Sequence, residues 1–298
     1  MSRFRILASC FAGCLLTVIH LQSQTKASCT FKTWVLDPAD LNNPREQASG
    51  VNDNRTVVGV ASYTFNKPNL WGFVHYSSGA ITYWRPANAK YSFLNGRNNV
   101  GNTVGGYVDT LGIGHAAYLH GSTTTLIVHP KAAHHSTGLV GINNLNTLLG
   151  GYTDVNGNGH IFKRRSDGTF VGVPNFPGAK QTSADGFNDN GVVVGTYLNP
   201  GDCCGLSHGF IYRNNSFASL NYRNITNSNT ELDGISNGGV IVGNHYANGF
   251  LYQNGVFKDI VGPNGEQVTA RGISANGIIT GDMWINGSGS HGVTAVCQ

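Results

Sequence analysis

Charged side chains are scarce in this 298-residue sequence, because Asp, Glu, Lys and Arg together make up only 11% of it. Three of its 19 basic residues, Arg3, Arg5 and Lys26, lie in the first 27 residues, which contain no acid. The remainder therefore has 16 basic and 15 acidic residues, a formal net charge of +1. Binding to nucleic acid needs clustered positive charge that displaces counterions from phosphates. No basic stripe of that kind is present, so nucleic acid is excluded as an expected partner.

Long hydrophobic runs are rare as well. The one apolar run, Ile6 to Ile19, follows Arg3 and Arg5 and precedes small residues at Thr25 and Ala27. This order is typical of a secretory signal peptide, and the run is too short and too early for a membrane span. We therefore predict a signal peptide over residues 1–27, an extracellular or periplasmic location, and no membrane span in the remainder.

Glycine and asparagine are abundant, with 41 and 33 residues. Both residue types favour tight turns, so this composition is typical of a turn-dense, all-β secreted protein.

A ten-residue motif, Gly-x-Asn/Ser followed by six residues and a second Gly, occurs six times. Its first glycines are separated by 46, 45, 45, 48 and 38 residues, and they are Gly50, Gly96, Gly141, Gly186, Gly234 and Gly272. A period of this length indicates one supersecondary unit stacked on copies of itself. We place the starts of the repeats near residues 48, 94, 139, 184, 232 and 270.

The fourth repeat shows the expected unit most clearly. Its predicted strands are Ser183–Phe187, Val192–Tyr197, His208–Tyr212 and Phe217–Leu220, with an Asn-rich turn between the first two. Four antiparallel strands in about 45 residues form one blade of a β-propeller. A β-solenoid, the alternative, has a shorter coil and no four-stranded meander. The sequence thus predicts an all-β fold, a six-bladed propeller of four-stranded antiparallel blades formed by residues 28–298 as a single domain.

The two ends of the chain predict how the ring closes. The sixth repeat stops after its third strand, His291 to Val296, while the N-terminal segment Phe31 to Pro38 resembles a fourth strand. We expect this N-terminal strand to complete the last blade. Cys29 and Cys297 would then meet at the seam and form a disulfide, as suits an exported protein.

The third strand of each repeat carries a recurring signature. It reads Trp71-Gly72-Phe73, His115-Ala116-Ala117, His160-Ile161-Phe162, His208-Gly209-Phe210, Asn248-Gly249-Phe250 and His291-Gly292-Val293. Together with the Gly-Ile-Asn phrase it resembles the HAF-repeat family of probable extracellular bacterial proteins, over essentially all of residues 28–298. The resemblance implies export and a repeat architecture. It supplies no reaction and no catalytic residues.

The residue before the first motif glycine is the first candidate site, because it varies while the glycine does not. It is Ser49, Asn95, Val140, Asp185, Asp233 and Arg271 in the six repeats. We expect it to open the innermost strand at the mouth of the central channel. Asp185, Asp233 and Arg271 then form either an interblade ion pair or a binding or catalytic constellation.

The loops joining strands two and three, and strand four to the next blade, should share one face, and long loops on a rigid scaffold often carry function. His134 and His135 lie in such a loop and are candidates for a general base or metal ligand. Tyr197, Tyr246 and Trp284 are expected on the same face, where their rings could stack on sugars.

Two further segments have alternative interpretations. Asp154, Asn156 and Asn158 match the first half of a calcium loop, although Arg165 stands where a bidentate Glu is needed; the alternative is an ordinary Asx turn. Cys203 and Cys204 form a vicinal disulfide or bridge two molecules.

Two functions fit these observations. The first is a secreted binding or adhesion module, expected to be a monomer without a required cofactor, whose loop-rich face recognises a carbohydrate or another extracellular polymer. The second is a polysaccharide lyase or glycoside hydrolase in which Asp185, Asp233, Arg271 and His134 or His135 act at the channel mouth.

Overall fold

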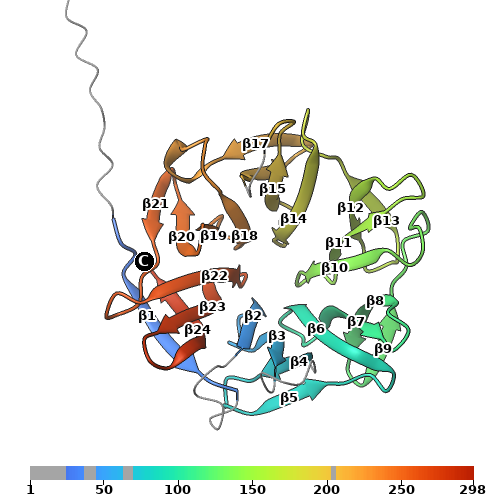
Figure 1. Cartoon of the computed structure of the whole chain (residues 1–298), viewed down its shortest axis with the longest axis horizontal. Helices are drawn as coiled ribbons and strands as arrows, with labels where there is room; N and C mark the ends of the chain where they lie inside the picture. Colours follow the sequence, from blue (N-terminus) through green and yellow to red (C-terminus); the bar gives the residue numbers. More distant parts are fainter. Residues whose placement is uncertain (1–24, 37–44, 63–69, 203–205) are drawn as a thin grey trace, which may run out of the picture.

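The computed structural model describes residues 25–36, 45–62, 70–202 and 206–298. Its strands form six four-stranded antiparallel sheets around a central axis (Figure 1), which confirms the predicted propeller. Beyond the strands, the described residues contain one 3-10 turn, η2 (Tyr222–Asn224). None of these elements is a helix long and apolar enough to span a bilayer.

Each blade runs from the innermost to the outermost strand. The first two blades are β2 (Arg45–Val51), β3 (Val57–Ser62), β4 (Leu70–His75), β5 (Ile81–Trp84), and β6 (Ala89–Arg97), β7 (Thr103–Asp109), β8 (Gly114–His120), β9 (Thr123–Leu126). The next two are β10 (Thr137–Ile142), β11 (Leu148–Thr153), β12 (Gly159–Arg164), β13 (Phe170–Val173), and β14 (Gln181–Phe187), β15 (Val193–Leu198), β16 (His208–Arg213), β17 (Ser216–Leu220). The last two are β18 (Glu231–Ile235), β19 (Ile241–His245), β20 (Asn248–Gln253), β21 (Val256–Asp259), and β22 (Gln267–Ile273), β23 (Ile278–Ile285), β24 (Gly289–Cys297), β1 (Cys29–Trp34).

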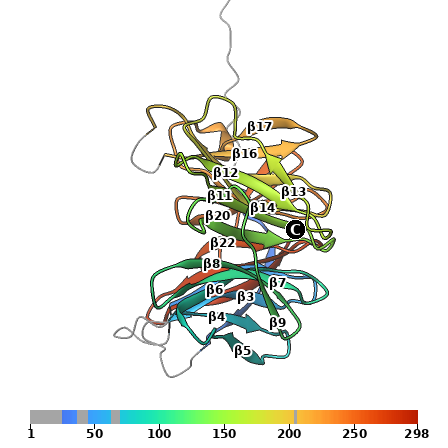
Figure 2. The ribbon, with the colours of Figure 1, turned by 90° about the vertical axis from the view of Figure 1, so that its right-hand side faces the viewer.

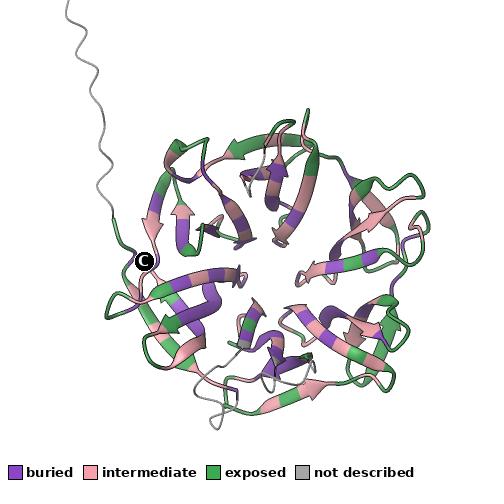
Figure 3. Ribbon diagram, in the orientation of Figure 1, coloured by how far each residue is buried: buried purple, intermediate pink, exposed green. Residues whose placement is uncertain are grey.

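The core lies between neighbouring blades. One phenylalanine of the third strand is fully buried in four of the blades; these are Phe73, Phe162, Phe210 and Phe250. Exposure increases toward the outermost strands, and β9 is exposed along its whole length (Figure 3). Loops extend from both faces of the ring (Figure 2).

The N-terminal strand closes the ring as predicted. Strand β1 pairs antiparallel with β24, with Cys29 opposite Cys297 and Trp34 opposite Gly292. The two cysteines form a disulfide that joins positions 268 residues apart in the sequence.

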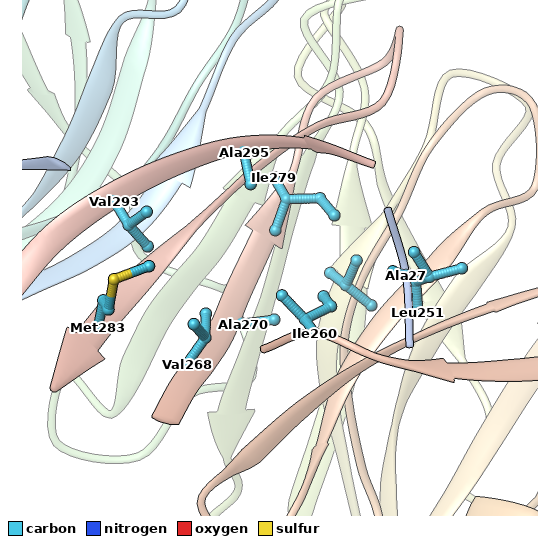
Figure 4. Close-up of a cluster of buried hydrophobic side chains, with 10 residues drawn as sticks. Ala27, Leu251, Ile260, Val268, Ala270, Ile279, Met283, Val293 and Ala295 are labelled. Carbon is cyan, nitrogen blue, oxygen red and sulfur yellow. The ribbon is translucent and has the colours of Figure 1, made fainter. Parts of the chain in front are cut away.

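Residues 25–27 lie outside this blade and attach the chain to its neighbour. The Ala27 amide donates to the Asp259 carbonyl at 2.9 Å, and the Asp259 amide donates to the Thr25 carbonyl at 3.0 Å. Ala27 is buried in one cluster with Leu251 and Ile260 (Figure 4). The signal-peptide boundary after residue 27 stays a prediction, and cleavage there would remove these contacts.

A β-bulge interrupts the innermost strand of every blade. The extra residue is the one before the first motif glycine, at Ser49, Asn95, Val140, Asp185, Asp233 and Arg271. The expectation that this residue opens the strand is therefore wrong, since it lies inside it. A bulge re-aims a side chain, and here it directs the variable residue into the channel.

The second motif glycine is required by the same bulge. A Cβ atom at Gly195 would lie 2.0 Å from the carbonyl oxygen of Ser183, just before the bulge at Asp185. The equivalent distance is 1.9–2.3 Å in the other blades, so the position admits no side chain.

Gly195→Ala should therefore lower the free energy of unfolding by about 1–3 kcal/mol or prevent folding, because backbone atoms must move. Gly172→Ala is the matched control, since a Cβ there meets no atom within 4 Å. Denaturant unfolding of both variants measures the difference. Equal stability of the two would contradict the close approach.

An interblade belt of polar side chains runs around one end of the channel. The third motif residue, Asn in four repeats, donates its side-chain amide at 2.9–3.3 Å to the carbonyl of its counterpart in the next blade; these residues are Asn52, Asn98, Asn143 and Asn188. Its side-chain oxygen accepts the amide four residues later in its own turn. Ser236 and Ser274 keep this second bond through their hydroxyls.

The next residue along the chain adds a second set of bonds to the belt. The Asp53 amide donates to the Asn99 side chain at 2.9 Å, and the Asn99 amide donates to that of Asn144 at 2.9 Å. The belt returns to its start where the Asn276 amide donates to the Asp53 carboxylate at 2.9 Å. This belt explains why the turns favour asparagine, which carries a donor and an acceptor on one short side chain.

Asn98→Ala should lower the free energy of unfolding by about 2–3 kcal/mol, because it leaves the buried Asn102 amide without a partner and removes the interblade hydrogen bond to the Asn143 carbonyl. Asn98→Ser should lose about half as much, since its hydroxyl can accept the turn amide as Ser236 does. Thermal and denaturant unfolding provide the comparison. If Asn98→Ser were no more stable than Asn98→Ala, the separate roles assigned to the side-chain oxygen and the side-chain amide of Asn98 would be refuted.

Candidate functional site

The six bulge residues surround a central cavity of about 260 Å³. Asn95, Asp185, Asp233 and Arg271 all line it, so the structure brings together the residues predicted from their position before the glycine. Strands β14, β18 and β22 belong to three successive blades (Figure 1), and they place Asp185, Asp233 and Arg271 in sequence around one half of the channel.

The two aspartates also line a second cavity, of about 330 Å³, between blades 4 and 5. Glu231, Thr196 and Ser207 complete its polar wall. Ser207 follows the long loop after β15, so this cavity lies toward the loop-rich face. Asp185 and Asp233 therefore connect the channel with an interblade space.

Each aspartate has weak or partial hydrogen bonding. Asp185 accepts from the Ser183 and Thr196 hydroxyls at 3.4 Å each. One Asp233 oxygen accepts from the Asn244 side-chain amide at 2.9 Å. Their carboxyl groups thus retain hydrogen-bonding capacity toward a ligand.

Burial raises the pKa of Asp185 to about 7, with a further contribution from the negative charge of Glu231. Burial raises the pKa of Asp233 well above its usual range, and the charges of Asp185 and Glu231 raise it further. The raised pKa values favour the protonated forms of both carboxyl groups, and a protonated carboxyl group can donate as well as accept hydrogen bonds.

Arg271 does not present a free cation to the channel. Its Nε donates to the Asp282 carboxylate at 2.5 Å, and the other oxygen of Asp282 accepts the Ala48 amide at 3.2 Å. Asp282 thus links the ion pair, which lies within blade 6, to the backbone of blade 1. The interblade ion pair expected between Arg271 and Asp185 or Asp233 is wrong in its partner, because Arg271 pairs within its own blade.

Asp282 belongs to a set of partners that the sequence reasoning missed. The residue after the second motif glycine faces the bulge residue, and it is polar in blades 4, 5 and 6: Thr196, Asn244 and Asp282. Each bonds the bulge residue of its own blade. In the other three blades this position holds Val60, Gly106 and Gly151. A comparison of the six repeats at this one position would have identified the partners.

His134 and His135 do not join this site. Both are exposed in the turn before β10, with left-handed backbone at φ 46° and 61°. Neither lines the central cavity or the interblade cavity. The structure therefore gives no support to a catalytic group that combines either histidine with Asp185 and Asp233.

Tyr197 is not available for a ligand, which corrects its expected binding role. Its side chain is 7% exposed, its ring stacks on Phe176 with centroids 3.8 Å apart, and its hydroxyl bonds that of Ser219 at 2.9 Å. Corresponding stacks join His129 to Tyr152 and Tyr222 to His245. A ring from the preceding loop thus packs against the end of the second strand in three successive blades.

Of the other predicted binding residues, Tyr246 and Trp284 are 63% and 55% exposed. Asn95 lines the central cavity while its amide donates to the Leu139 carbonyl at 2.7 Å. Cys203 and Cys204 lie outside the described residues.

The Asp154 loop closes as an Asx turn. One carboxylate oxygen accepts the amides of Asn156 and Asn158 at 2.9 Å, and the other bonds the His160 ring at 2.9 Å. Asp109 and His115 form the same arrangement one blade earlier. Within the described part of the chain, no group of three or more His, Cys, Asp and Glu side chains could hold a metal ion. Calcium binding stays a prediction, and the carboxylate oxygens are already in use.

No protein-family model and no curated protein sequence matches this chain. Solved structures share its fold. A gluconolactonase of Xanthomonas campestris matches 92% of this chain and 97% of its own with 12% identity and a TM-score of 0.51. TolB of Acinetobacter baumannii covers 80% of this chain and 63% of its own, with 13% identity and a TM-score of 0.51. The β-propeller domain of the Trilobed protease of Pyrococcus furiosus covers 82% and 78%, with 10% identity and a TM-score of 0.50.

The raised pKa values predict how stability depends on pH. Between about pH 4, where an aspartate ordinarily titrates, and about pH 7, folded Asp185 binds a proton that the unfolded chain has released. This group therefore lowers the free energy of unfolding as pH rises through that range. Buried histidines such as His129 and His245, whose pKa values are lowered by burial, act in the opposite direction.

The difference in the free energy of unfolding between wild type and Asp185→Asn isolates the contribution of the Asp185 carboxyl group. We expect the variant to gain stability relative to wild type as pH increases from 5 to 7. Asp167→Asn, at an exposed aspartate of another blade, should show no such gain. Unfolding midpoints across pH measure both. Parallel curves for wild type and Asp185→Asn would contradict a raised pKa.

Proposed function

We propose that this chain is an exported propeller of the HAF-repeat type that binds a neutral extracellular glycan. The observation that carries the proposal is the carboxyl pair of Asp185 and Asp233, which lines both the central and the interblade cavity. Sugar hydroxyls donate and accept hydrogen bonds, as do carboxyl groups that are partly protonated. The hydroxyls of Thr196 and Ser207 extend the same chemistry.

The charge of the site favours a neutral sugar over a uronate. The central cavity is lined by two arginines, Arg97 and Arg271, of which Arg271 is neutralised by Asp282. The interblade cavity is lined, among the described residues, by no basic residue and by three acidic residues, Asp185, Asp233 and Glu231. A like charge brought to this wall would be repelled. The cavity volumes, about 260 and 330 Å³, suit a single sugar unit.

A glycoside hydrolase remains the second candidate, for one specific reason. Asp185, with a pKa near 7, could act as a general acid beside the second carboxyl. The lyase version has less support in the form predicted, because Arg271 is paired with Asp282 and both candidate histidines lie elsewhere. This leaves Arg97 as the cation of the central cavity, and no histidine of the described residues lines that cavity as a base.

Glycan-array binding of wild type, Asp185→Asn and Asp233→Asn tests the proposal, with Asp167→Asn as the control. Binding of neutral glycans should fall about tenfold or more in the two channel variants, without loss of thermal stability. Release of reducing sugar from bound glycans, abolished in Asp185→Asn, would establish the hydrolase instead. Unchanged binding in both channel variants would refute a site at the carboxyl pair.

A further inference from the structure

A separate cavity of about 520 Å³ lies over blade 5, between the loops that flank it. The loop after β17 contributes Tyr222 and Arg223, the β19–β20 turn contributes His245 and Asn248, and the segment from Asp259 to Gln267 completes the wall. It shares no lining residue with the channel cavity or the cavity of Asp185 and Asp233.

Asp259 organises the polar wall of this cavity. Its two oxygens accept the Tyr222 hydroxyl at 2.6 Å and the Arg223 guanidinium at 2.9 Å. The Arg223 Nε atom is buried and has no hydrogen-bond partner in the described part of the chain. A buried donor without a partner is unfavourable, and Arg223 lines the cavity, so a ligand that enters it can supply the acceptor that this guanidinium lacks. The amides of Asn248 and Gln267 add neutral donors and acceptors.

The charge balance of the wall defines the ligand class. Arg223 is neutralised by Asp259, whereas Glu266 keeps its negative charge because hydrogen bonds from Asn264 lower its pKa. An anionic ligand would meet this carboxylate, and a cation would meet the guanidinium. A neutral molecule with several hydroxyls satisfies the guanidinium and the amides without either conflict.

An exposed aromatic ring adjoins the wall. Tyr246 is 63% exposed, and its ring meets the ring of His245 edge-to-face at 4.8 Å. Tyr246 and Arg223 both have left-handed backbone, with φ of 55° and 49°, which bulky residues rarely adopt. In the corresponding stack of blade 4, Phe176 stands where blade 5 has Tyr222, so that stack lacks the hydroxyl that bonds Asp259. The polar pocket is therefore a departure of this blade from its repeat.

From these contacts we propose that the cavity over blade 5 binds one neutral sugar unit, with Arg223 as hydrogen-bond donor and Tyr246 as stacking ring. This site goes beyond the channel site, and it can be present whether or not the carboxyl pair binds a glycan. A glycan with two such units could then engage both sites of one molecule.

The experiment titrates full-length protein with glucose, galactose, fucose and N-acetylglucosamine, and with glucuronate as the charged comparison. Amide resonances of Gly249 and Gly265, which line the cavity, report binding there, while those of Gly186 and Gly234 report the channel. At least one neutral sugar should shift the first pair at millimolar concentration, and glucuronate should not.

Two substitutions should each weaken this binding about tenfold. Arg223→Lys removes the Nε donor, and Tyr246→Asn removes the ring while asparagine tolerates the left-handed backbone. Arg213→Lys, at an exposed arginine of β16, is the matched control, and Asp185→Asn should leave the affinity at this cavity unchanged. The proposal is overturned if no neutral sugar shifts these resonances at concentrations up to about 100 mM. It is also overturned if glucuronate binds with the same affinity as the neutral sugars, or if both variants bind the sugar with the affinity of wild type. If Asp185→Asn loses only the sugar-induced shifts of the Gly186 and Gly234 resonances, that result tests the carboxyl pair and leaves the proposal for this cavity supported.

Discussion

One extra residue in each innermost strand, the β-bulge, determines which side chains line the channel and where the repeat requires its second glycine. The bulge turns the side chain before the first motif glycine into the channel, and it brings a carbonyl so close to the second glycine that no side chain fits there. The second motif glycine is therefore a consequence of the bulge, whereas the first is required by the next blade, since a Cβ at Gly186 would lie 2.7 Å from the Cα atom of Gly234. The channel wall includes the variable residue before the motif, together with the first motif glycine and the residue that follows it.

The ring is regular in backbone and asymmetric in chemistry. Blades 4, 5 and 6 place a polar residue opposite the bulge, at Thr196, Asn244 and Asp282, whereas the other three blades have a small or apolar residue there. Ionisable groups consequently gather in one half of the channel, where burial keeps Asp185 and Asp233 protonated to unusually high pH. In the other half the bulge residues Ser49, Asn95 and Val140 are uncharged, and among the described residues the ionisable group that lines the channel there is Arg97 of β6.

The repeat made the architecture predictable, because six copies in register report the same blade. The closing strand and the Cys29–Cys297 disulfide were also predictable, since the last repeat lacks a strand that the N-terminus supplies. The exposure of individual side chains was harder to predict, because the alternation of apolar and polar residues along a strand does not reveal which loop covers the end of that strand. Tyr197 is covered by Phe176 from the previous blade, whereas Tyr246, in a similar loop, is exposed. The pairing of Arg271 with Asp282 needed strand register, which the bulge shifts by one residue.

The closing strand also constrains the order in which the chain can fold. Strand β1 is synthesised first, yet its partner β24 ends at Cys297, next to the last residue of the sequence. Strand β1 must remain unpaired until β24 has been synthesised, and the edge of β24 stays open until the two strands pair. An open strand edge invites pairing with another chain, and such long-range pairing is slow. The final blade is thus the part of the ring most exposed to incorrect pairing before closure, and the disulfide can form only as its last step.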